Sequence, residues 1–385
     1  MIHMKDNNLA KIIIVAGGTG GHIFPALATG KTLRRMAPQV EVSFLCGDRP
    51  LEIDMYKRAD ESPFIMPARH FGTGIVSRIS GLFALIVNIV RCVCIFRKQQ
   101  PKVIVGFGGY VSGPAILASK LLGIKTLIHE ANAITGKTNL WLSRMVDIFA
   151  INFNETRKTL SCKQDKIVVT KMPICNFASP DKQGAYEYFG LNPNKKTLLI
   201  IGGSQGAKVM YEHLAAIIQS LSHDSAISSN WQILWSTGQN NYESLTIMFE
   251  PKADEGMPLI IKFLPFISRM DYALAISDCA ISRSGASTVA ELLTAHIVPL
   301  FVPLPTAIYN HQEINARTVC ATGFGQVLKQ DELGNIDDST RVIKEFLETQ
   351  AAADSITIPQ EFVCNDAAEL LSQEIMKLFG DNNRH

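Results

Sequence analysis

Two glycine-rich loops contain the residues best suited to hold negative charge. The first reads GGTGGH at residues 17–22, and the second reads GGSQGA at residues 202–207. Each follows a short aliphatic run and precedes a helical pattern, so backbone N–H groups and the helix dipole can bind an anion there. The first loop lacks the GxGxxG spacing, and no acidic residue closes the next strand for a ribose, so an NAD-binding oxidoreductase is disfavoured. Two such loops suit a diphosphate.

A third helix start, SRSGASTVAE at residues 282–291, contains small residues that let a ligand approach the backbone. Glu291 lies one helical turn after Ser287, where its carboxylate can accept hydrogen bonds from both hydroxyls of a ribose. Taken alone, the segment has a simpler interpretation, in which Ser287 and Thr288 cap a helix and Glu291 lies on its solvated face. The segment is therefore compatible with a nucleotide without requiring one.

Two side chains in the first half are candidate proton acceptors. His22 ends the first loop at a predicted helix N-terminus, where the helix dipole favours a neutral imidazole. Glu130, in the segment HEAN at residues 129–132, is either a general base or a member of a hydrogen-bonded loop pair. We favour His22, because histidine is the most common general base near neutral pH. The alternative for His22 is that it binds an acceptor diphosphate or caps the loop.

The chain has no pattern of metal ligands. It contains no Asp-x-Asp pair, and its eight cysteines are scattered without the paired spacing of a zinc site or a redox motif. We therefore predict no metal and no cofactor, and we expect backbone dipoles and side chains to stabilise a diphosphate leaving group.

Short β-branched runs alternate with longer helical patterns, which is typical of parallel sheets covered by helices. The predicted fold class is α/β, with two Rossmann-like domains whose parallel sheets face a cleft. In the first half, strands are expected at residues 11–16, 41–46, 102–105, 126–129 and 147–152. In the second half, they are expected at residues 197–201, 232–236, 259–263, 278–282 and 298–302. The loops above follow such strands, at the edge where parallel sheets bind ligands.

A chain of 385 residues exceeds what one hydrophobic core usually holds, so two domains are expected. The segments KIIIVAGGTGGH and TLLIIGGSQGA form an imperfect internal repeat, one in each half. Prolines, glycine and polar residues place the boundary near residues 173–180. The predicted domains are 1–175 and 176–364, and a helix at 365–385 is expected to return to the first domain.

The composition indicates a globular protein, with 47% hydrophobic and 19% charged residues. The net charge of +2 gives no reason to expect nucleic acid. The apolar run at 12–16 is too short for a signal peptide, and the cysteine usage fits a reducing cytoplasm. The run at 75–96 is almost long enough to cross a membrane, but Arg78, Asn88 and Arg91 interrupt it. It is either a buried core helix or an amphipathic surface resting on lipid.

Six motifs occur in one order along the chain, namely GGTGGHIFPALA, GFGGYVSGP, HEANAITGKTNLWL, GGSQGA, SRSGASTVAE and NHQEINA. Together, they resemble the MurG family, bacterial glycosyltransferases of the GT-B fold that add N-acetylglucosamine to lipid I, the undecaprenyl-diphospho-muramoylpentapeptide. The similarity covers nearly the whole chain. It implies inverting transfer from UDP-N-acetylglucosamine to the C4 hydroxyl of the muramoyl sugar, giving lipid II and UDP in peptidoglycan synthesis.

The resemblance assigns roles to individual residues. It implies a UDP-sugar site on the second domain, formed by Ser204, Ile267, Arg283, Ala286, Ser287, Thr288, Val289, Glu291 and Gln312. It implies an acceptor site on the first domain, formed by Thr19, Gly20, Gly21, His22, Tyr110, Glu130 and Asn132. The helix at 82–96 resembles the family's membrane-facing patch, which favours an anionic membrane surface as a partner and a peripheral location on the cytoplasmic face of the plasma membrane.

Two departures from the family pattern affect these expectations. The family usually reads Gly-Asn-Pro-Val-Arg where this chain reads KMPIC at residues 171–175, so an arginine expected near the nucleotide is replaced by Cys175. Ala131 replaces a common glutamine on the acceptor side. The alternatives left open are a related glycosyltransferase acting on diacylglycerol and an inactive nucleotide-sugar-binding protein at the membrane.

Overall fold

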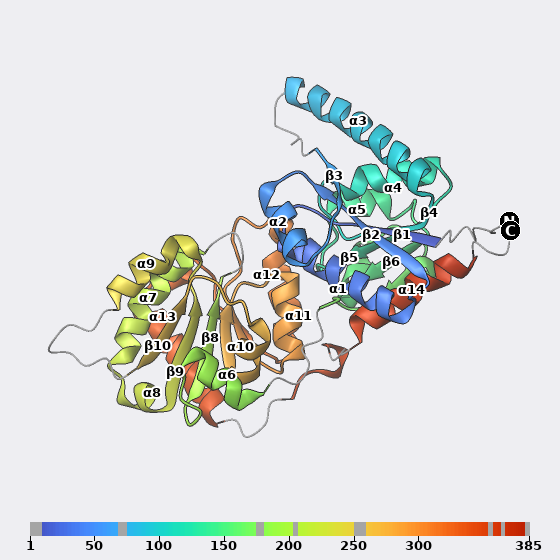
Figure 1. Ribbon diagram of the computed structural model, residues 1–385. Coiled ribbons are helices and arrows are strands. Elements are labelled where there is room, and N and C mark those ends of the chain that lie inside the picture. The colour runs from blue at the N-terminus through green and yellow to red at the C-terminus, as the bar shows by residue number, and fades with distance from the viewer. Residues whose placement is uncertain are drawn as a thin grey trace. The chain divides into compact units, whose positions relative to one another are not determined.

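The computed structural model describes residues 10–67, 75–174, 181–202, 207–249, 259–352, 357–362 and 366–381. The chain divides into two compact units (Figure 1). The first unit comprises Met1–Cys175 and Asp366–His385, and the second comprises Asn176–Asn365. Each unit has one sheet in which every pair of neighbouring strands is parallel, which confirms the prediction of two Rossmann-like domains.

The sheet of the first unit has the order β3-β2-β1-β4-β5-β6-β7. Its strands are β1 (Ala10–Val15), β2 (Val40–Gly47), β3 (Phe64–Met66), β4 (Pro101–Gly106), β5 (Lys125–Glu130), β6 (Ile148–Ile151) and β7 (Ile167–Val169). The strand order reverses between β1 and β4, and ligands of open parallel sheets bind at such a switch point. The sequence did not predict the short strands β3 and β7, which form the two edges of this sheet.

Helices cover both faces of this sheet, because the side chains of its strands alternate between two cores. The helices are α1 (Gly20–Met36), α2 (Pro50–Arg58), α3 (Ile75–Gln99), α4 (Ser112–Leu121), α5 (Lys137–Leu142) and α14 (Ala367–Asp381), with 3-10 turns η1 (Asn154–Thr159) and η2 (Gln164–Lys166). Ile12 and Ile14 of β1 belong to the core shared with α1 and α14. Ile13 and Val15 belong to the core shared with α3 and α4.

The C-terminal helix α14 completes the first unit, as the sequence predicted. Leu371, Ile375 and Leu378 lie in the same core cluster as Ile23 and Leu33 of α1. Each of these three α14 side chains is 5% exposed or less. The core of the first unit is therefore assembled from the two ends of the chain (Figure 1).

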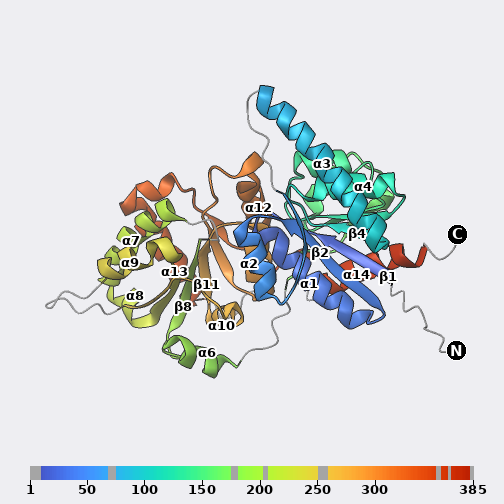
Figure 2. The same ribbon diagram turned by 45° about the horizontal axis from the view of Figure 1, so that its top comes forward.

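Helix α3 has one buried face and one exposed apolar face. Ala84, Asn88, Cys92 and Phe96 recur every fourth residue and are buried. On another face lie four exposed apolar side chains at helical spacing, Leu82, Phe83, Ile86 and Val90, each more than half exposed. Residues 80–99 are long and apolar enough to cross a membrane, by length and composition only. Figure 2 shows the N-terminal part of α3 extending beyond α4.

The sheet of the second unit has the order β10-β9-β8-β11-β12-β13. Its strands are β8 (Lys196–Ile201), β9 (Trp231–Ser236), β10 (Ile260–Leu264), β11 (Cys279–Ser282), β12 (Val298–Phe301) and β13 (Gln326–Val327). The order reverses between β8 and β11, so this unit repeats the switch point of the first. The two-residue edge strand β13 was not predicted.

The helices of the second unit connect these strands. They are α6 (Lys182–Phe189), α7 (Lys208–Ser222), α8 (Ser225–Asn230), α9 (Gln239–Met248), α10 (Met270–Ile276), α11 (Ala286–Thr294), α12 (His311–Cys320) and α13 (Ile336–Ala352), with 3-10 turns η3 (Ile308–Asn310), η4 (Glu332–Gly334) and η5 (Gln360–Phe362).

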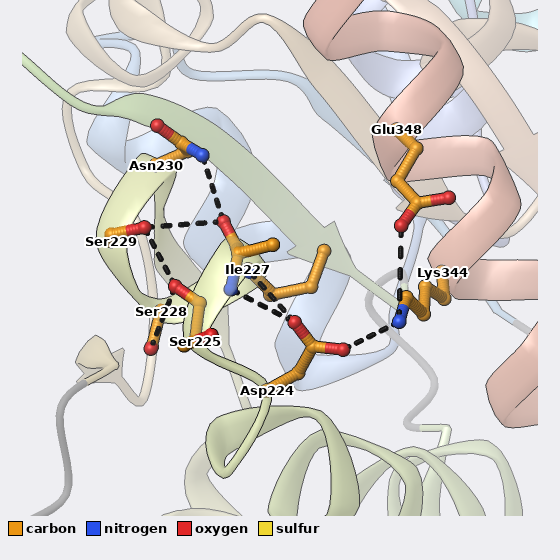
Figure 3. Close-up of polar contacts among 9 residues, drawn as sticks. Asp224, Ser225, Ile227, Ser228, Ser229, Asn230, Lys344 and Glu348 are labelled. Atoms are coloured by element: carbon orange, nitrogen blue, oxygen red, sulfur yellow. Dashed lines mark hydrogen bonds and ion pairs between the residues drawn. The ribbon is translucent and has the colours of Figure 1, made fainter.

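Asp224 joins two of these helices (Figure 3). One carboxylate oxygen accepts hydrogen bonds from the N–H groups of Ala226 and Ile227 and so caps α8. The other lies 2.6 Å from Nζ of Lys344 on α13. The hydrogen bond from Lys344 and those from the backbone lower the pKa of Asp224, so this capping interaction is lost as the solution becomes acidic.

Candidate active site

The two glycine loops of the first unit meet at its switch point. Gly109, which follows β4, has φ of +79°, and a Cβ atom there would lie 2.2 Å from the carbonyl oxygen of Gly17, which follows β1. Gly108 has φ of +107°, and a Cβ atom there would lie 2.9 Å from the imidazole of His22. Only glycine combines this backbone conformation with such close approach. The motifs GGTGGH and GFGGY thus form one structure around His22.

The hydrogen bond of His22 defines which of its nitrogens can accept a proton. Nδ1 lies 3.0 Å from the carbonyl oxygen of Gly17. A carbonyl oxygen only accepts, so Nδ1 must carry the hydrogen, and Nε2 of the neutral ring is then the basic nitrogen. His22 lies in the first turn of α1, as the sequence predicted, and its imidazole is only partly buried. A ring bonded in this way keeps one nitrogen able to accept a proton, which a general base needs.

The first turn of α1 also has backbone N–H groups that no hydrogen bond within the helix uses. Thr19 is the N-cap residue, in extended conformation, and its side chain does not cap the helix. The N–H groups of Gly20 and Gly21 therefore have no partner within the helix and can face an anion. Thr19, Gly20 and Gly21 thus lie at the same helix start as His22.

Glu130, the second candidate base, is committed to its own loop. The side chain is 4% exposed. Oε1 accepts hydrogen bonds from the backbone and side-chain N–H groups of Asn132, and Oε2 accepts from the N–H of Gly136 and the side chain of Asn139. Four donors occupy the lone pairs of this carboxylate. The geometry fits the predicted loop pair better than a proton acceptor.

His129, the neighbour of Glu130 in sequence, is entirely buried. It bonds to Lys171, in the last segment of the first unit before the chain enters the second. Its Nε2 lies 2.9 Å from the carbonyl oxygen of Lys171, and its Nδ1 has no partner among the described residues. Burial, together with the nearby His22, lowers the pKa of His129 to about 4, against the backbone hydrogen bond to Lys171, which raises it. His129 is thus neutral at physiological pH.

Lys171 has φ of +60°, the left-handed conformation that favours glycine. Lys171 occupies the position where the family usually has glycine. A lysine at this φ therefore has a less favourable backbone conformation than glycine would have. We expect Lys171→Gly to stabilise the first unit by roughly 0.5–1 kcal/mol, the conformational penalty minus the extra chain entropy of glycine. Urea denaturation followed by circular dichroism measures this change. Lys171→Ala keeps the unfavourable φ and should give no gain; an equal gain would contradict the explanation.

A buried carboxylate that the sequence analysis missed lies under the first glycine loop. Glu52, in the first turn of α2, is 1% exposed. Its Oε2 accepts a hydrogen bond of 2.9 Å from the N–H of Gly47, and its Oε1 lies 3.2 Å from the hydroxyl of Tyr110. Burial and the neighbouring Glu52 raise the pKa of Tyr110. The Tyr110 hydroxyl donates to Glu52, so we assign it a supporting position and not the direct acceptor contact that the resemblance implied.

In the second unit, part of the second loop lies outside the described residues, including Ser204. Gly202 and Ala207 border it, and a Cβ atom on Gly202 would lie 2.3 Å from the hydroxyl oxygen of Tyr211. That hydroxyl donates to the carbonyl oxygen of Ser236. The loop after β8 therefore starts from a tightly packed glycine at the switch point.

Helix α11 begins on the other side of this switch point. Its N-cap is Gly285, in extended conformation and without a side-chain cap, so Ser287 and Thr288 are not the capping residues. The N–H groups of the first turn have no partner within the helix. Ala286 and Val289 are buried, and the hydroxyl of Ser287 is buried with no partner among the described residues. An anion at this helix start would meet unpaired donors.

Glu291 lies one turn further along α11. It is partly exposed, and no hydrogen bond to its carboxylate occurs among the described residues. Desolvation by the surrounding protein raises its pKa to about 7. A carboxylate with unused lone pairs is suited to accept two hydroxyl groups.

Arg283 is directed into the protein. Its Nη1 donates to the carbonyl oxygens of Val302 and Pro303, and its Nη2 donates to the side chain of Gln330. The side chain is 5% exposed, and burial lowers its pKa to about 10. Through these contacts the guanidinium supports the loop after β12, while its Nε has no partner among the described residues.

Gln312 and Ile267 are also held in place by the protein. Gln312 accepts a hydrogen bond from the N–H of Leu304 through Oε1, and its backbone carbonyl accepts one from Ser284. Its amide nitrogen is the group left for a ligand. Ile267 is 3% exposed, so only its backbone could contact a base. Cys175 lies outside the described residues, and no group of His, Cys, Asp and Glu suited to a metal occurs among those the structure describes.

Comparison with known proteins gives consistent matches. The models of the glycosyltransferase family 28 N-terminal and C-terminal domains match residues 12–151 and 197–370. A UDP-N-acetylglucosamine–N-acetylmuramyl-(pentapeptide) pyrophosphoryl-undecaprenol N-acetylglucosamine transferase of Desulforamulus reducens is 34% identical, over 88% of this chain and 91% of that protein. The same enzyme of Bacillus licheniformis is 32% identical, over 96% and 98%.

Solved structures agree with these matches. The crystal structure of Acinetobacter baumannii MurG superimposes with a TM-score of 0.71 at 27% identity, covering 96% of this chain and 99% of that one. A UDP-GlcNAc 2-epimerase from Neisseria meningitidis gives a TM-score of 0.68 at 14% identity, covering 95% and 100%, which supports the fold alone.

The two parallel sheets, their paired switch-point loops and the two domain matches define a glycosyltransferase of the two-Rossmann type. The matches to curated relatives extend over both units. The chain belongs to the MurG family within glycosyltransferase family 28.

Proposed function

We propose that this protein transfers N-acetylglucosamine from UDP-N-acetylglucosamine to the muramoyl C4 hydroxyl of lipid I, giving lipid II and UDP. The observation that carries the proposal is that both switch points have the chemistry this reaction needs. The first presents an imidazole whose Nδ1 bonds to Gly17, beside N–H groups at the start of α1 that have no partner within the helix. The second presents an uncapped helix start followed by a carboxylate with unused lone pairs.

The donor would bind to the second unit. Its diphosphate would accept hydrogen bonds from the N–H groups at the start of α11 and from the hydroxyl of Ser287. Its ribose hydroxyls would donate to Glu291, and Gln312 would contact the sugar through its amide nitrogen. Ser204 and the backbone of Ile267 remain proposed contacts to the phosphate and the uracil.

We propose a transfer step in which His22 is the base. The C4 hydroxyl of the acceptor attacks the anomeric carbon while Nε2 of His22 takes its proton, which inverts the anomeric configuration. The bond from the anomeric carbon to the diphosphate oxygen breaks at the same time. The negative charge that develops on UDP is stabilised by the N-terminus of α11. The N–H groups of Gly20 and Gly21 would hold the diphosphate of lipid I.

One experiment tests the reaction and its alternatives. The purified protein is incubated with labelled UDP-N-acetylglucosamine and a short-chain lipid I analogue, and the lipid fraction is analysed for the disaccharide. We expect the disaccharide, with diacylglycerol giving no product. Product from diacylglycerol alone would favour the related lipid glycosyltransferase. Tight UDP binding without product would favour an inactive nucleotide-sugar-binding protein.

We also propose that the exposed apolar face of α3 rests on the cytoplasmic face of the plasma membrane. Leu82, Phe83, Ile86 and Val90 form the stripe, and we call them the α3 stripe. Arg97 and Lys98 are exposed at the C-terminal end of the same helix, where they could meet anionic headgroups. Ile89 lies between these residues in sequence but packs partly against the core, so it does not belong to the stripe.

Glutamates in the α3 stripe should abolish membrane binding. Leu82 and Phe83 are 57% and 63% exposed, so Leu82→Glu with Phe83→Glu should leave the fold intact. We expect the wild-type protein to sediment with liposomes containing anionic lipid, and the double variant to stay in the supernatant. A matched control is Ile247→Glu with Met248→Glu, two exposed apolar residues of α9. Equal loss of binding in the control would refute a specific role of the stripe.

A further inference from the structure

The carboxylate of Glu52 contacts residues at the carboxyl ends of three strands, beside the switch point of the first unit. As the third residue of α2, a glutamate would ordinarily bond the N–H of its own N-cap residue. Here Oε2 instead accepts from Gly47, the last residue of β2, and Oε1 accepts from Tyr110 after β4. A Cβ atom on Gly17, after β1, would lie 2.7 Å from the same Oε2. Glu52 therefore contacts the carboxyl ends of three adjacent strands.

The loops after two of these strands enclose the ring of His22. The carbonyl oxygen of Gly17 accepts the hydrogen bond from Nδ1, and Glu52 packs against that glycine. On the other side, the loop ending at Tyr110 places Gly108 against the edge of the imidazole. The bond from Tyr110 to Glu52 holds this loop. A buried carboxylate is costly unless it is hydrogen bonded or paired, and that of Glu52 is both, because Nε of Arg49 lies 3.8 Å from its Oε1.

We propose that Glu52 is a positioning residue for transfer, which keeps Nε2 of His22 in the basic tautomer and aimed at the acceptor. The inference rests on the proposed role of His22 as the base. Glu52 acts through the Gly17 peptide and the loop of Tyr110, and it does not touch the substrate. A base displaced by about 1 Å can lose up to roughly 10²-fold in rate, so the effect should be visible in kcat.

The test is a double-mutant cycle with the full-length protein and the lipid I analogue. Glu52→Ala should lower kcat by about 10- to 100-fold and leave the KM for UDP-N-acetylglucosamine nearly unchanged. Glu52→Gln keeps the size of the side chain and can accept from Gly47 while donating to Tyr110, so it should recover most of that loss. In the His22→Ala background, Glu52→Ala should have little further effect, because it acts through His22.

The possible outcomes distinguish the positioning role of Glu52 from the role of His22 as the base. A loss from Glu52→Ala that is equally large with and without His22 would overturn the positioning role while leaving His22 as the base. No loss from His22→Ala would overturn both. If Glu52→Ala does not fold, Tyr110→Phe removes one of the same contacts, and its cycle with His22→Ala gives the same test. Additive effects there would also reject the proposal.

Discussion

Replacing His22 with alanine is expected to lower kcat by roughly 10²- to 10⁴-fold, the usual contribution of a general base. The KM for UDP-N-acetylglucosamine should change little, because the proposed donor contacts all lie on the second unit. Steady-state kinetics with saturating lipid I analogue measures both constants. The structural basis is the hydrogen bond from Nδ1 to Gly17, which leaves Nε2 as the basic nitrogen.

Glu130 provides the comparison. Glu130→Gln removes a carboxylate that accepts four N–H hydrogen bonds. The new NH2 group would face the NH2 group of Asn139, and two donors cannot bond to each other. We expect a loss of stability of about 1–3 kcal/mol, the cost of unsatisfied buried groups, with a milder effect on kcat than His22→Ala. The roles would be reversed if Glu130→Gln damaged kcat more and His22→Ala mainly raised the KM for the lipid acceptor.

Removing the carboxylate of Glu291 should erase the preference for a ribose over a deoxyribose. The intact protein should bind UDP more tightly than 2′-deoxy-UDP, and Glu291→Ala should bind both equally. The expected loss for UDP is roughly 1.5–3 kcal/mol, typical of hydrogen bonds to a charged group and equivalent to about 10- to 150-fold in Kd. Isothermal titration calorimetry measures these constants. Equal affinity of the intact protein for the two nucleotides would remove Glu291 from the site.

The same carboxylate should make binding depend on pH. Its pKa of about 7 means that near neutrality part of the free protein carries a protonated Glu291. Ribose hydroxyls donate better to the ionised form, so binding shifts the equilibrium toward it and lowers the pKa. The Kd for UDP should therefore rise as the pH falls from 8 to about 6. Glu291→Gln cannot titrate and should flatten this dependence; an unchanged profile would argue against the assignment.

The central strands of both sheets could be predicted from the sequence, because they are buried and consist of continuous aliphatic runs. The runs before residues 17 and 202 coincide with β1 and β8 almost to the residue. The strands β3, β7 and β13 contain three, three and two residues. Such short edge strands depend on pairing with a neighbour and have too little pattern to detect.

The site was predicted as a set of motifs but not as a set of contacts. The spacing of GGTGGH and GFGGY did not reveal that Gly108 lies against the ring of His22, because that contact depends on how β1 and β4 pair. Glu52 was missed because it belongs to no glycine motif. It lies beyond the end of the predicted strand at 41–46, within a helical segment that carries no pattern of a ligand site. The motif around Arg283 likewise did not reveal that its Nη1 donates to the backbone after β12.

The arrangement of α14 has a consequence for how the protein is made. The ribosome adds amino acids at roughly 5–20 residues per second, so the second unit takes roughly 10–40 s to synthesise after residue 175. Throughout that time, the face of α1 that receives Leu371, Ile375 and Leu378 is not yet covered. The second unit is therefore complete in the growing polypeptide before the first can close its core. The nascent first unit is the stage at which aggregation or chaperone binding is most to be expected.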